Sequence, residues 1–263
     1  MMIPSHDARI FQILFLGLLL GIGVFVRDFS LQLSNIAWTF TAGLLTQWFF
    51  LRLLRLRNAG YLSPLITCLS LSLLLRSDRW WIHPLCAVIA MTSKFLIRFN
   101  GKHLFNPGNL GVIFALTFLP GSWASPGQWG NDLLLAGWIF VLGVAVASRA
   151  ERSDISWSFL IFYASFLGLR VLWLGQRPHV WLHQLQNGAL LLFTFFMISD
   201  PMTIPNHRHG RVIHAWVVAL FAFVWQFVLF RTNGLLWGLL FASILVPIWD
   251  RIFPAQKYDW RMR

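Results

Sequence analysis

The stretch Phe196–Pro205, FMISDPMTIP, decides how this chain folds. It follows a long apolar run, and it places Asp200 directly before Pro201, with a second proline at Pro205. A proline after an acidic residue at the end of a membrane helix predicts a broken helix. Unwound backbone at membrane depth is tolerated where it contacts protein or lines a cavity. We therefore predict a polytopic membrane protein whose backbone at this point is shaped for a ligand.

The composition supports a membrane protein. The chain has 263 residues, of which 57% are hydrophobic and 11% are charged, whereas about a quarter of the residues of a soluble domain are charged. The net charge is +12, but the positive residues lie at the ends of apolar runs. This excludes nucleic acid as a partner and predicts contact with anionic lipid headgroups. Cys68 and Cys86 lie within apolar segments without paired spacing, so we expect them to pack and not to bind metal.

Ten apolar segments predict about ten transmembrane helices in an all-α membrane protein, at roughly 20 residues per crossing. The first segment ends before Arg27 and Asp28 without a small-residue cleavage site, so we interpret it as a membrane helix and not as a signal peptide. Several segments are short, which predicts broken or re-entrant helices. The segments are 10–26, 34–54, 60–75, 80–97, 107–120, 132–148, 156–174, 180–198, 212–230 and 234–250.

The distribution of positive charge predicts the orientation. If every second loop lies on the side of the N-terminus, that side holds 14 of the 21 Lys and Arg residues and the opposite side holds 5; Lys94 and Arg170 fall within segments. Such a bias is typical of cytoplasmic loops. The sequence therefore predicts an even number of crossings with both termini in the cytoplasm.

Two stretches resemble one another. Arg98–Pro120, RFNGKHLFNPGNLGVIFALTFLP, and Arg231–Pro247, RTNGLLWGLLFASILVP, both place Arg, Asn and Gly before an apolar segment that ends in proline. Each closes a set of five segments, and an odd number of segments per half inverts one half relative to the other. We predict a single membrane domain, 1–263, with two inverted five-helix halves at about 1–120 and 131–252.

Two polar constellations are candidates for a binding site. The first, Gly101–Gly111 (GKHLFNPGNLG), offers freed backbone groups and asparagine side chains to a polar aromatic ligand. An ordinary turn followed by a proline in the first helical turn explains it equally simply. The second is Asp200, which is costly near a membrane unless it is paired or solvated. It is either a functional acid or a helix-end acid paired with Arg208, Arg211 or His214.

Two cations fall near the end of the fourth segment. Lys94 and Arg98 are four residues apart, which predicts that they share a helix face. They would either meet phosphate or anionic lipid or, more simply, extend to the membrane interface. The chain has no nucleophile elbow, phosphate loop, dinucleotide fingerprint or CxxC pair, so redox chemistry would require a bound cofactor.

The string FMISDPMTIP, followed by GR and a further apolar helix, resembles a family of membrane proteins. The family contains the B-type membrane component of the sodium-translocating NADH:quinone reductase and the D-type membrane component of the Rnf electron transport complex. FNPGNLG (105–111) resembles the Asn-Pro motif of this family, and Leu245–Asp250 is similar to its closing helix. The resemblance spans roughly 60–251. The chain looks like a short, stand-alone relative, and GKHLFNP is similar to membrane proteins of enediyne-type biosynthetic clusters.

The resemblance implies flavin, either FMN linked covalently to a threonine in a Ser-Gly-Ala-Thr motif or noncovalent riboflavin. The corresponding region here is Gly121–Asp132, GSWASPGQWGND, which contains Ser122 and Ser125 but no threonine. We therefore predict that covalent FMN is absent. A noncovalent flavin, riboflavin or FMN, remains the expectation. The residues expected to hold it are Lys102, Asn106, Pro107, Asn109, Asp200 and Thr203.

The resemblance implies an electron-transfer subunit of the bacterial inner (cytoplasmic) membrane, with the lipid bilayer and a redox subunit as partners. Inverted halves and broken helices suit a transporter of a small solute, such as a flavin or a metabolite, equally well. A scaffold without any ligand is a third interpretation, because a fold does not determine a function. The sequence leaves all three open.

Overall fold

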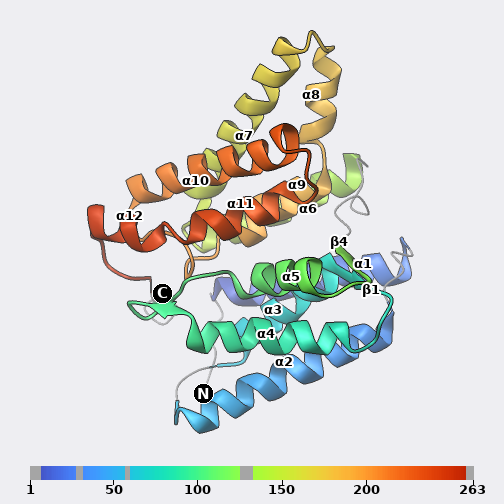
Figure 1. The fold of residues 1–263 in the computed structure, drawn as a ribbon, viewed down its shortest axis with the longest axis vertical. Helices are drawn as coiled ribbons and strands as arrows, with labels where there is room; N and C mark the ends of the chain where they lie inside the picture. The colour runs from blue at the N-terminus through green and yellow to red at the C-terminus, as the bar shows by residue number, and fades with distance from the viewer. Residues whose placement is uncertain (1–6, 28–31, 57–59, 125–132, 259–263) are drawn as a thin grey trace. The chain divides into compact units, whose positions relative to one another are not determined.

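The computed structural model describes residues 7–27, 32–56, 60–124 and 133–258, most of them helical (Figure 1). The chain divides into two compact units, Met1–Ser125 and Pro126–Arg263. Each unit is described by itself. The inverted relation between the two predicted halves stays a prediction.

The first unit is built from five helices and two short antiparallel strand pairs. Helix α3 packs against α1, α2, α4 and α5, and α4 also packs against α2 and α5. Strands β1 and β4 pair in the register Leu75↔Ala124. In chain order the elements are α1 (Ala8–Phe25), α2 (Leu33–Leu53), α3 (Leu62–Leu74), β1 (Leu75–Ser77), α4 (Ile82–Leu96), β2 (Arg98–Phe99), β3 (Lys102–His103), α5 (Pro107–Phe118) and β4 (Ser122–Ala124).

Helix α2 turns a largely polar face inward. Its buried residues, Asn35, Thr39, Gly43, Gln47 and Phe50, recur at helical spacing. A Cβ added at Gly43 would lie 2.5 Å from Cys68 Sγ of α3, so glycine is what allows this close approach. Thr39 Oγ1 lies 3.2 Å from the Nδ1 of His83 on α4. Small and polar residues of this kind bring helices together where lipid supplies no hydrophobic drive.

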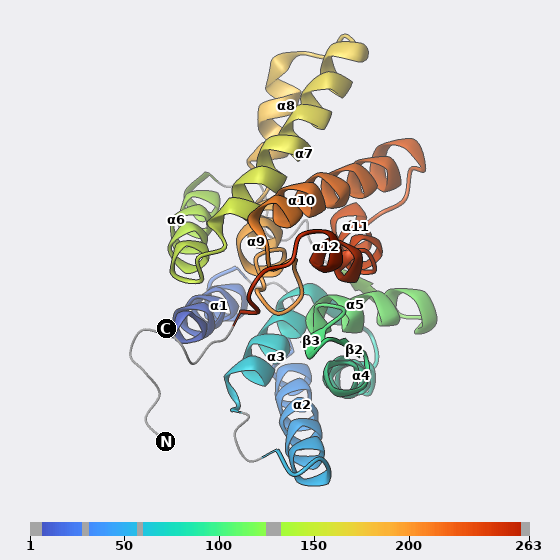
Figure 2. The ribbon, with the colours of Figure 1, turned by 90° about the vertical axis from the view of Figure 1, so that its left-hand side faces the viewer.

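A two-residue hairpin connects α4 to the next helix. Strands β2 and β3 pair through Arg98↔His103 and Phe99↔Lys102. Asn100 and Gly101 form the turn with φ of 47° and 80°, which is the backbone that a two-residue hairpin turn with the right twist requires. In Figure 2 this hairpin lies beside α4 and α5.

The second unit consists of helices, two of which continue into π-helical turns. Helix α10 packs against α7 and α11, α8 runs back along α7, and α6 packs against α9 and η2 (Figures 1 and 2). The elements are α6 (Leu133–Arg149), α7 (Ser153–Trp173), α8 (Pro178–Leu185), α9 (Gly188–Leu192), η2 (Phe193–Met197), α10 (Arg208–Phe223), η3 (Val224–Val228), α11 (Gly234–Ser243) and α12 (Val246–Ile252).

Two glycines set the approach of α11 to α10. A Cβ at Gly234 would lie 2.6 Å from the carbonyl oxygen of Ala222, and a Cβ at Gly238 would lie 2.8 Å from that of Val218. The two glycines are four residues apart, so they lie on one helix face and let the two backbones meet. Asn233 precedes α11 with φ of 61°, and Asn100 has the same left-handed backbone in the corresponding RFNG stretch.

Helix length limits how many crossings the structure supports. Among the described residues, three helices are long and apolar enough to span a membrane, Ala8–Phe25, Ser153–Trp173 and Arg208–Val228. A fourth span is reached if α11 and α12, which are bent by 48°, count as one broken helix. The all-α membrane architecture is therefore supported, whereas ten crossings are not confirmed.

One predicted segment is two pieces. The apolar run 180–198 contains the end of α8, a break at Gln186 and Asn187, and then α9 with η2. Asn187 causes the restart, because its side-chain oxygen accepts the N–H of Ala189 at 2.8 Å and caps the new helix.

Candidate functional site

The stretch that decides the fold forms a compact turn after η2. Asp200 Oδ1 accepts the backbone N–H of Met202 at 3.1 Å. The N–H and the hydroxyl of Thr203 both donate to the carbonyl oxygen of Asp200, at 3.1 and 3.3 Å. Thr203 is almost fully buried. The helix is thus broken where Pro201 predicts, and its free backbone groups are satisfied within the turn.

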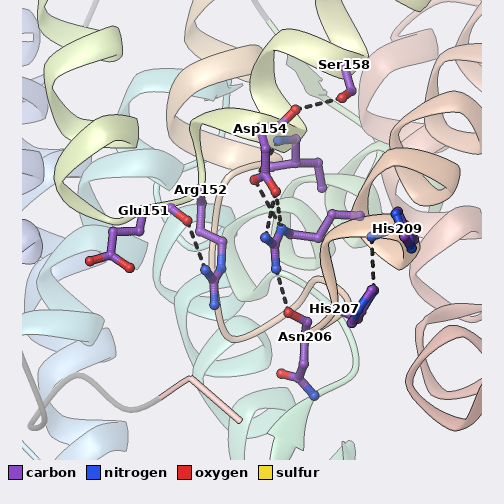
Figure 3. Close-up of polar contacts among 9 residues, drawn as sticks. Glu151, Arg152, Asp154, Ser158, Asn206, His207 and His209 are labelled. Carbon is purple, nitrogen blue, oxygen red and sulfur yellow. Dashed lines mark hydrogen bonds and ion pairs between the residues drawn. The ribbon is translucent and has the colours of Figure 1, made fainter. Parts of the chain in front are cut away.

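Arg211 has a different partner from the one predicted. Its Nε and Nη2 bond the carboxylate of Asp154 at distances from 2.6 to 3.0 Å, and its Nη1 donates to the carbonyl oxygen of Asn206. The expectation that Arg211 pairs with Asp200 is therefore wrong, because Asp154 occupies it from the first turn of α7. Figure 3 shows this contact with Asp154 and Asn206.

The loop that follows the turn is fixed from two sides. The backbone N–H of Asn206 donates to Asp250 Oδ1 of α12 at 2.7 Å. His207 Nδ1 accepts the N–H of His209 and caps α10 (Figure 3). The imidazole of His207 also stacks on the ring of Phe253. The starts of α7 and α10 and the end of α12 consequently lie at one end of the second unit.

The Asn-Pro motif begins α5 in the first unit. Asn106 is the N-cap, and its side-chain oxygen accepts the N–H of Asn109 at 3.1 Å. Pro107 occupies the first helical turn, where the missing N–H costs nothing. Asn109 is buried with 1% of its surface exposed. The ordinary helix start that the sequence allowed is present, and the asparagine side chains are positioned by it.

The hairpin places a buried histidine next to this helix start. One ring nitrogen of His103 donates to the backbone carbonyl of Lys94. Its Nδ1 is buried and has no hydrogen-bond partner within the described residues. Burial, and then the positive charges of Lys94 and Arg98, lower the pKa of His103 to about 3. The ring is therefore neutral at physiological pH, and Nδ1 presents a lone pair that can accept a hydrogen bond.

The cations near His103 are not arranged as the sequence predicts. Helix α4 ends at Leu96, so Arg98 lies on β2, where it is exposed and donates to the carbonyl of Gly101. Lys94 is buried, and its ammonium donates to Gln47 Oε1 of α2 at 3.3 Å. The prediction that Lys94 and Arg98 share a helix face and extend to the interface is wrong, since a polar partner on α2 holds Lys94 inside.

The structure groups the predicted flavin residues in two places. Lys102, Asn106, Pro107 and Asn109 lie within the hairpin and the first turn of α5 in the first unit. Asp200 and Thr203 lie within one turn of the second unit. Whether these six residues hold a flavin stays a prediction.

Sequence reasoning missed two residues. His103 was visible within GKHLFNP, but its burial depends on the hairpin. Asp154 follows two basic residues in the chain, and nothing in its local sequence indicates Arg211 as its partner, 57 residues later.

The region expected to lack covalent FMN is partly described. Ser122 Oγ lies 2.7 Å from the carbonyl oxygens of both Ala115 and Leu119. Ser125 lies outside the described residues.

Known proteins match this chain across the second unit. The sequence model of the NQR2, RnfD, RnfE family matches residues 117–259. The chain belongs to this family. Members similar to it include the D component of the ion-translocating oxidoreductase complex of Cronobacter sakazakii, 30% identical over 163 residues, which are 62% of this chain and 45% of that protein. The proteins of the same name from Erwinia tasmaniensis and Salmonella enteritidis are 29% identical over 134 residues and 31% identical over 136 residues, each 51% of this chain and 37% of the relative.

The extent of these matches limits what they carry. The matched part of this chain spans less than half the length of each of these relatives. The family match includes the turn at Asp200 and the Asp154–Arg211 pair, whereas Asn106 and His103 precede it. Family membership and the apolar helices identify a multi-pass membrane protein.

Proposed function

We propose that this chain is the membrane subunit of an ion-translocating, electron-transferring complex of the bacterial inner membrane, and that its first unit binds flavin noncovalently. The relatives' names refer to a complex with several subunits, so further subunits would be its partners. A flavin would supply one- and two-electron transfer, which none of this chain's side chains provides.

The observation that carries the proposal is the buried Nδ1 of His103. It is an acceptor without a donor among the described residues, and such atoms are costly unless a ligand or water supplies the missing hydrogen bond. Flavin offers suitable donors, the imide N–H of its ring and the hydroxyls of its ribityl chain. The residues present therefore fit the group.

The charges around His103 agree with this ligand. Lys94 and Arg98 are close enough to influence the His103 ring, and Lys102 is buried beside it on β3. Positive charges near a flavin favour its anionic reduced form. These residues would orient the ring and stabilise added negative charge.

Flavin titration tests the proposal. Purified full-length protein in detergent would be added to riboflavin and, separately, to FMN, while the quenching of flavin fluorescence is measured. His103→Leu should weaken binding about tenfold or more, because a flavin donor would be left without an acceptor. The matched control is His179→Leu, an exposed histidine of α8 in the other unit, which should bind as the wild type does.

Loss of binding in His103→Leu would not reflect unfolding. The substitution removes a buried acceptor without a partner, so we expect the variant to be at least as stable as the wild type. Binding of neither flavin by folded wild-type protein, or equal binding by His103→Leu, would contradict the proposal.

A further inference from the structure

Arg152 of the second unit has a hydrogen-bonding group that the described residues leave unused. The residue is 7% exposed and lies at the N-cap position of α7. Its Nη1 donates to the carbonyl oxygen of Glu151 at 2.9 Å (Figure 3). Its guanidinium carbon lies 4.7 Å from the centroid of the Tyr258 ring. The Nε–H is buried, and no residue that the structure describes accepts it.

Such a group requires an acceptor. The guanidinium is always charged and donates in a fixed planar geometry, so an unmatched Nε–H inside the protein is unfavourable. The stack on Tyr258 and the bond to Glu151 fix the plane of the guanidinium. The direction of the Nε–H is therefore set before any ligand arrives, which reduces the entropy that binding would cost.

The surrounding charges favour an anion. Arg211 lies close enough that, after burial itself, its charge is the next cause that lowers the pKa of Arg152, while Tyr258 and Asp154 act in the opposite direction. The carboxylate of Asp154 is already bonded through both oxygens by Arg211. The N-terminus of α7, a 21-residue helix, adds the positive end of its dipole at the same place.

The depth of this region fits the headgroup level of a membrane. Exposed arginines occupy the same end of the unit, at the end of α6, the start of α10 and the end of α12 (Arg149, Arg208 and Arg251). Exposed tryptophans follow a little further along the helices, Trp157 on α7 and Trp216 on α10. Tryptophan just inside a ring of basic residues is typical of a membrane–water interface.

We propose that Arg152 Nε and the N-terminus of α7 form a binding site for a phosphate-type oxyanion, supplied either by the phosphodiester of an acidic phospholipid headgroup or by a free phosphate compound. A phosphate oxygen accepts the Nε–H, and the charge of the group is balanced by Arg152 and the helix dipole. The site is independent of the flavin proposed for the first unit.

The experiment compares two sources of phosphate on the full-length protein. The thermal midpoint of unfolding is measured in neutral detergent against increasing inorganic phosphate, with chloride at equal ionic strength as reference. It is also measured in phosphatidylcholine nanodiscs with increasing phosphatidylglycerol. The variants are Arg152→Gln, Arg152→Lys and the exposed control Arg149→Gln.

We expect the wild type and Arg149→Gln to be stabilised by at least one of the two probes. Arg152→Gln should require about tenfold more of it for the same shift, because a charge-assisted hydrogen bond is lost. Should Arg152→Gln fail to fold, Arg152→Lys keeps the charge without the Nε–H and should show the same weakening. Stabilisation by phosphatidylglycerol alone identifies a headgroup site, and stabilisation by inorganic phosphate identifies a free phosphate site.

Two outcomes would overturn the proposal. One is that neither probe stabilises the wild type beyond its neutral reference. The other is that Arg149→Gln loses as much as Arg152→Gln and Arg152→Lys, which would show general attraction to positive charge and no specific site.

Discussion

Replacing Asp154 with asparagine should destabilise the second unit strongly. In the wild type, Arg211 donates three hydrogen bonds to this carboxylate, and the two side chains are only 9% and 18% exposed. The substitution is nearly isosteric, and the retained oxygen can still accept the N–H of Ile155. It leaves Arg211 buried without its counter-charge. Breaking a buried pair from one side costs about 3–5 kcal/mol, and because Asp154 is partly exposed we expect about 3 kcal/mol, the lower end.

The assay is equilibrium unfolding of the detergent-solubilised protein by sodium dodecyl sulfate, followed by tryptophan fluorescence. The control is Asp78→Asn, because Asp78 forms an ion pair with Arg79 at 3.9 Å with both side chains more than half exposed. That change should cost about 0–1 kcal/mol. In the double variant Asp154→Asn with Arg211→Met, part of the loss should be recovered, since no buried charge then lacks a partner. A cost for Asp154→Asn no larger than that for Asp78→Asn would refute the reasoning.

Three further predictions follow from single residues. Gly238→Ala should destabilise by about 1–3 kcal/mol, because its Cβ would meet α10 backbone, whereas Gly137→Ala, with nothing within 4 Å of the added Cβ, should be neutral or slightly stabilising; unfolding of both variants checks this, and equal effects would contradict it. The pKa of His103 is lowered from 6.5 to about 3, so the unfolded chain binds a proton below pH 6.5 that the folded chain does not, and stability should fall as pH decreases from 6.5 towards 3. His103→Asn should fall less steeply in thermal unfolding at several pH values, and a parallel dependence would count against burial of the ring. Acid precipitation of purified protein should leave no yellow colour in the pellet, because Gly121–Asp132 has no threonine to link FMN, and a yellow pellet would disprove this.

Much of the helical architecture could be predicted from the sequence. The apolar runs around Leu16 and Phe159 are strong enough to locate α1 and α7, and Asp200-Pro201 locates the break after η2. These signals are local, since they depend on hydropathy and on the missing N–H of proline. The number of crossings was less predictable, because a short apolar run does not distinguish a span from a half-helix or a packed internal helix.

The side-chain partners could not be predicted, because they join residues distant in the chain. Lys94 is held inside by Gln47, 47 residues earlier, and Arg211 by Asp154, 57 residues earlier. The exposed alternative for Lys94 was the simpler expectation for a long cation near a helix end. Only the packing of α2 on α4 shows that a polar partner was available inside.

The Asn-Pro motif shows how both interpretations of a pattern can hold. Asn106 and Pro107 begin α5 in the ordinary way, so the motif would be explained without any ligand. The neighbouring His103 Nδ1 is what the helix start does not account for. Sequence alone could not single out this atom, because its burial depends on the hairpin turn at Asn100 and Gly101.

An absorption spectrum of the purified wild-type protein, recorded before and after dithionite, tests the central claim most directly. The protein would be purified in mild detergent from cells supplied with riboflavin. We predict the two bands of oxidised flavin in the near-ultraviolet and the blue, both bleached by dithionite and both lost with the released flavin when the protein is denatured. A featureless spectrum from folded protein that also fails to take up added riboflavin or FMN would contradict the account, and would leave a solute transporter or a scaffold on the family's fold.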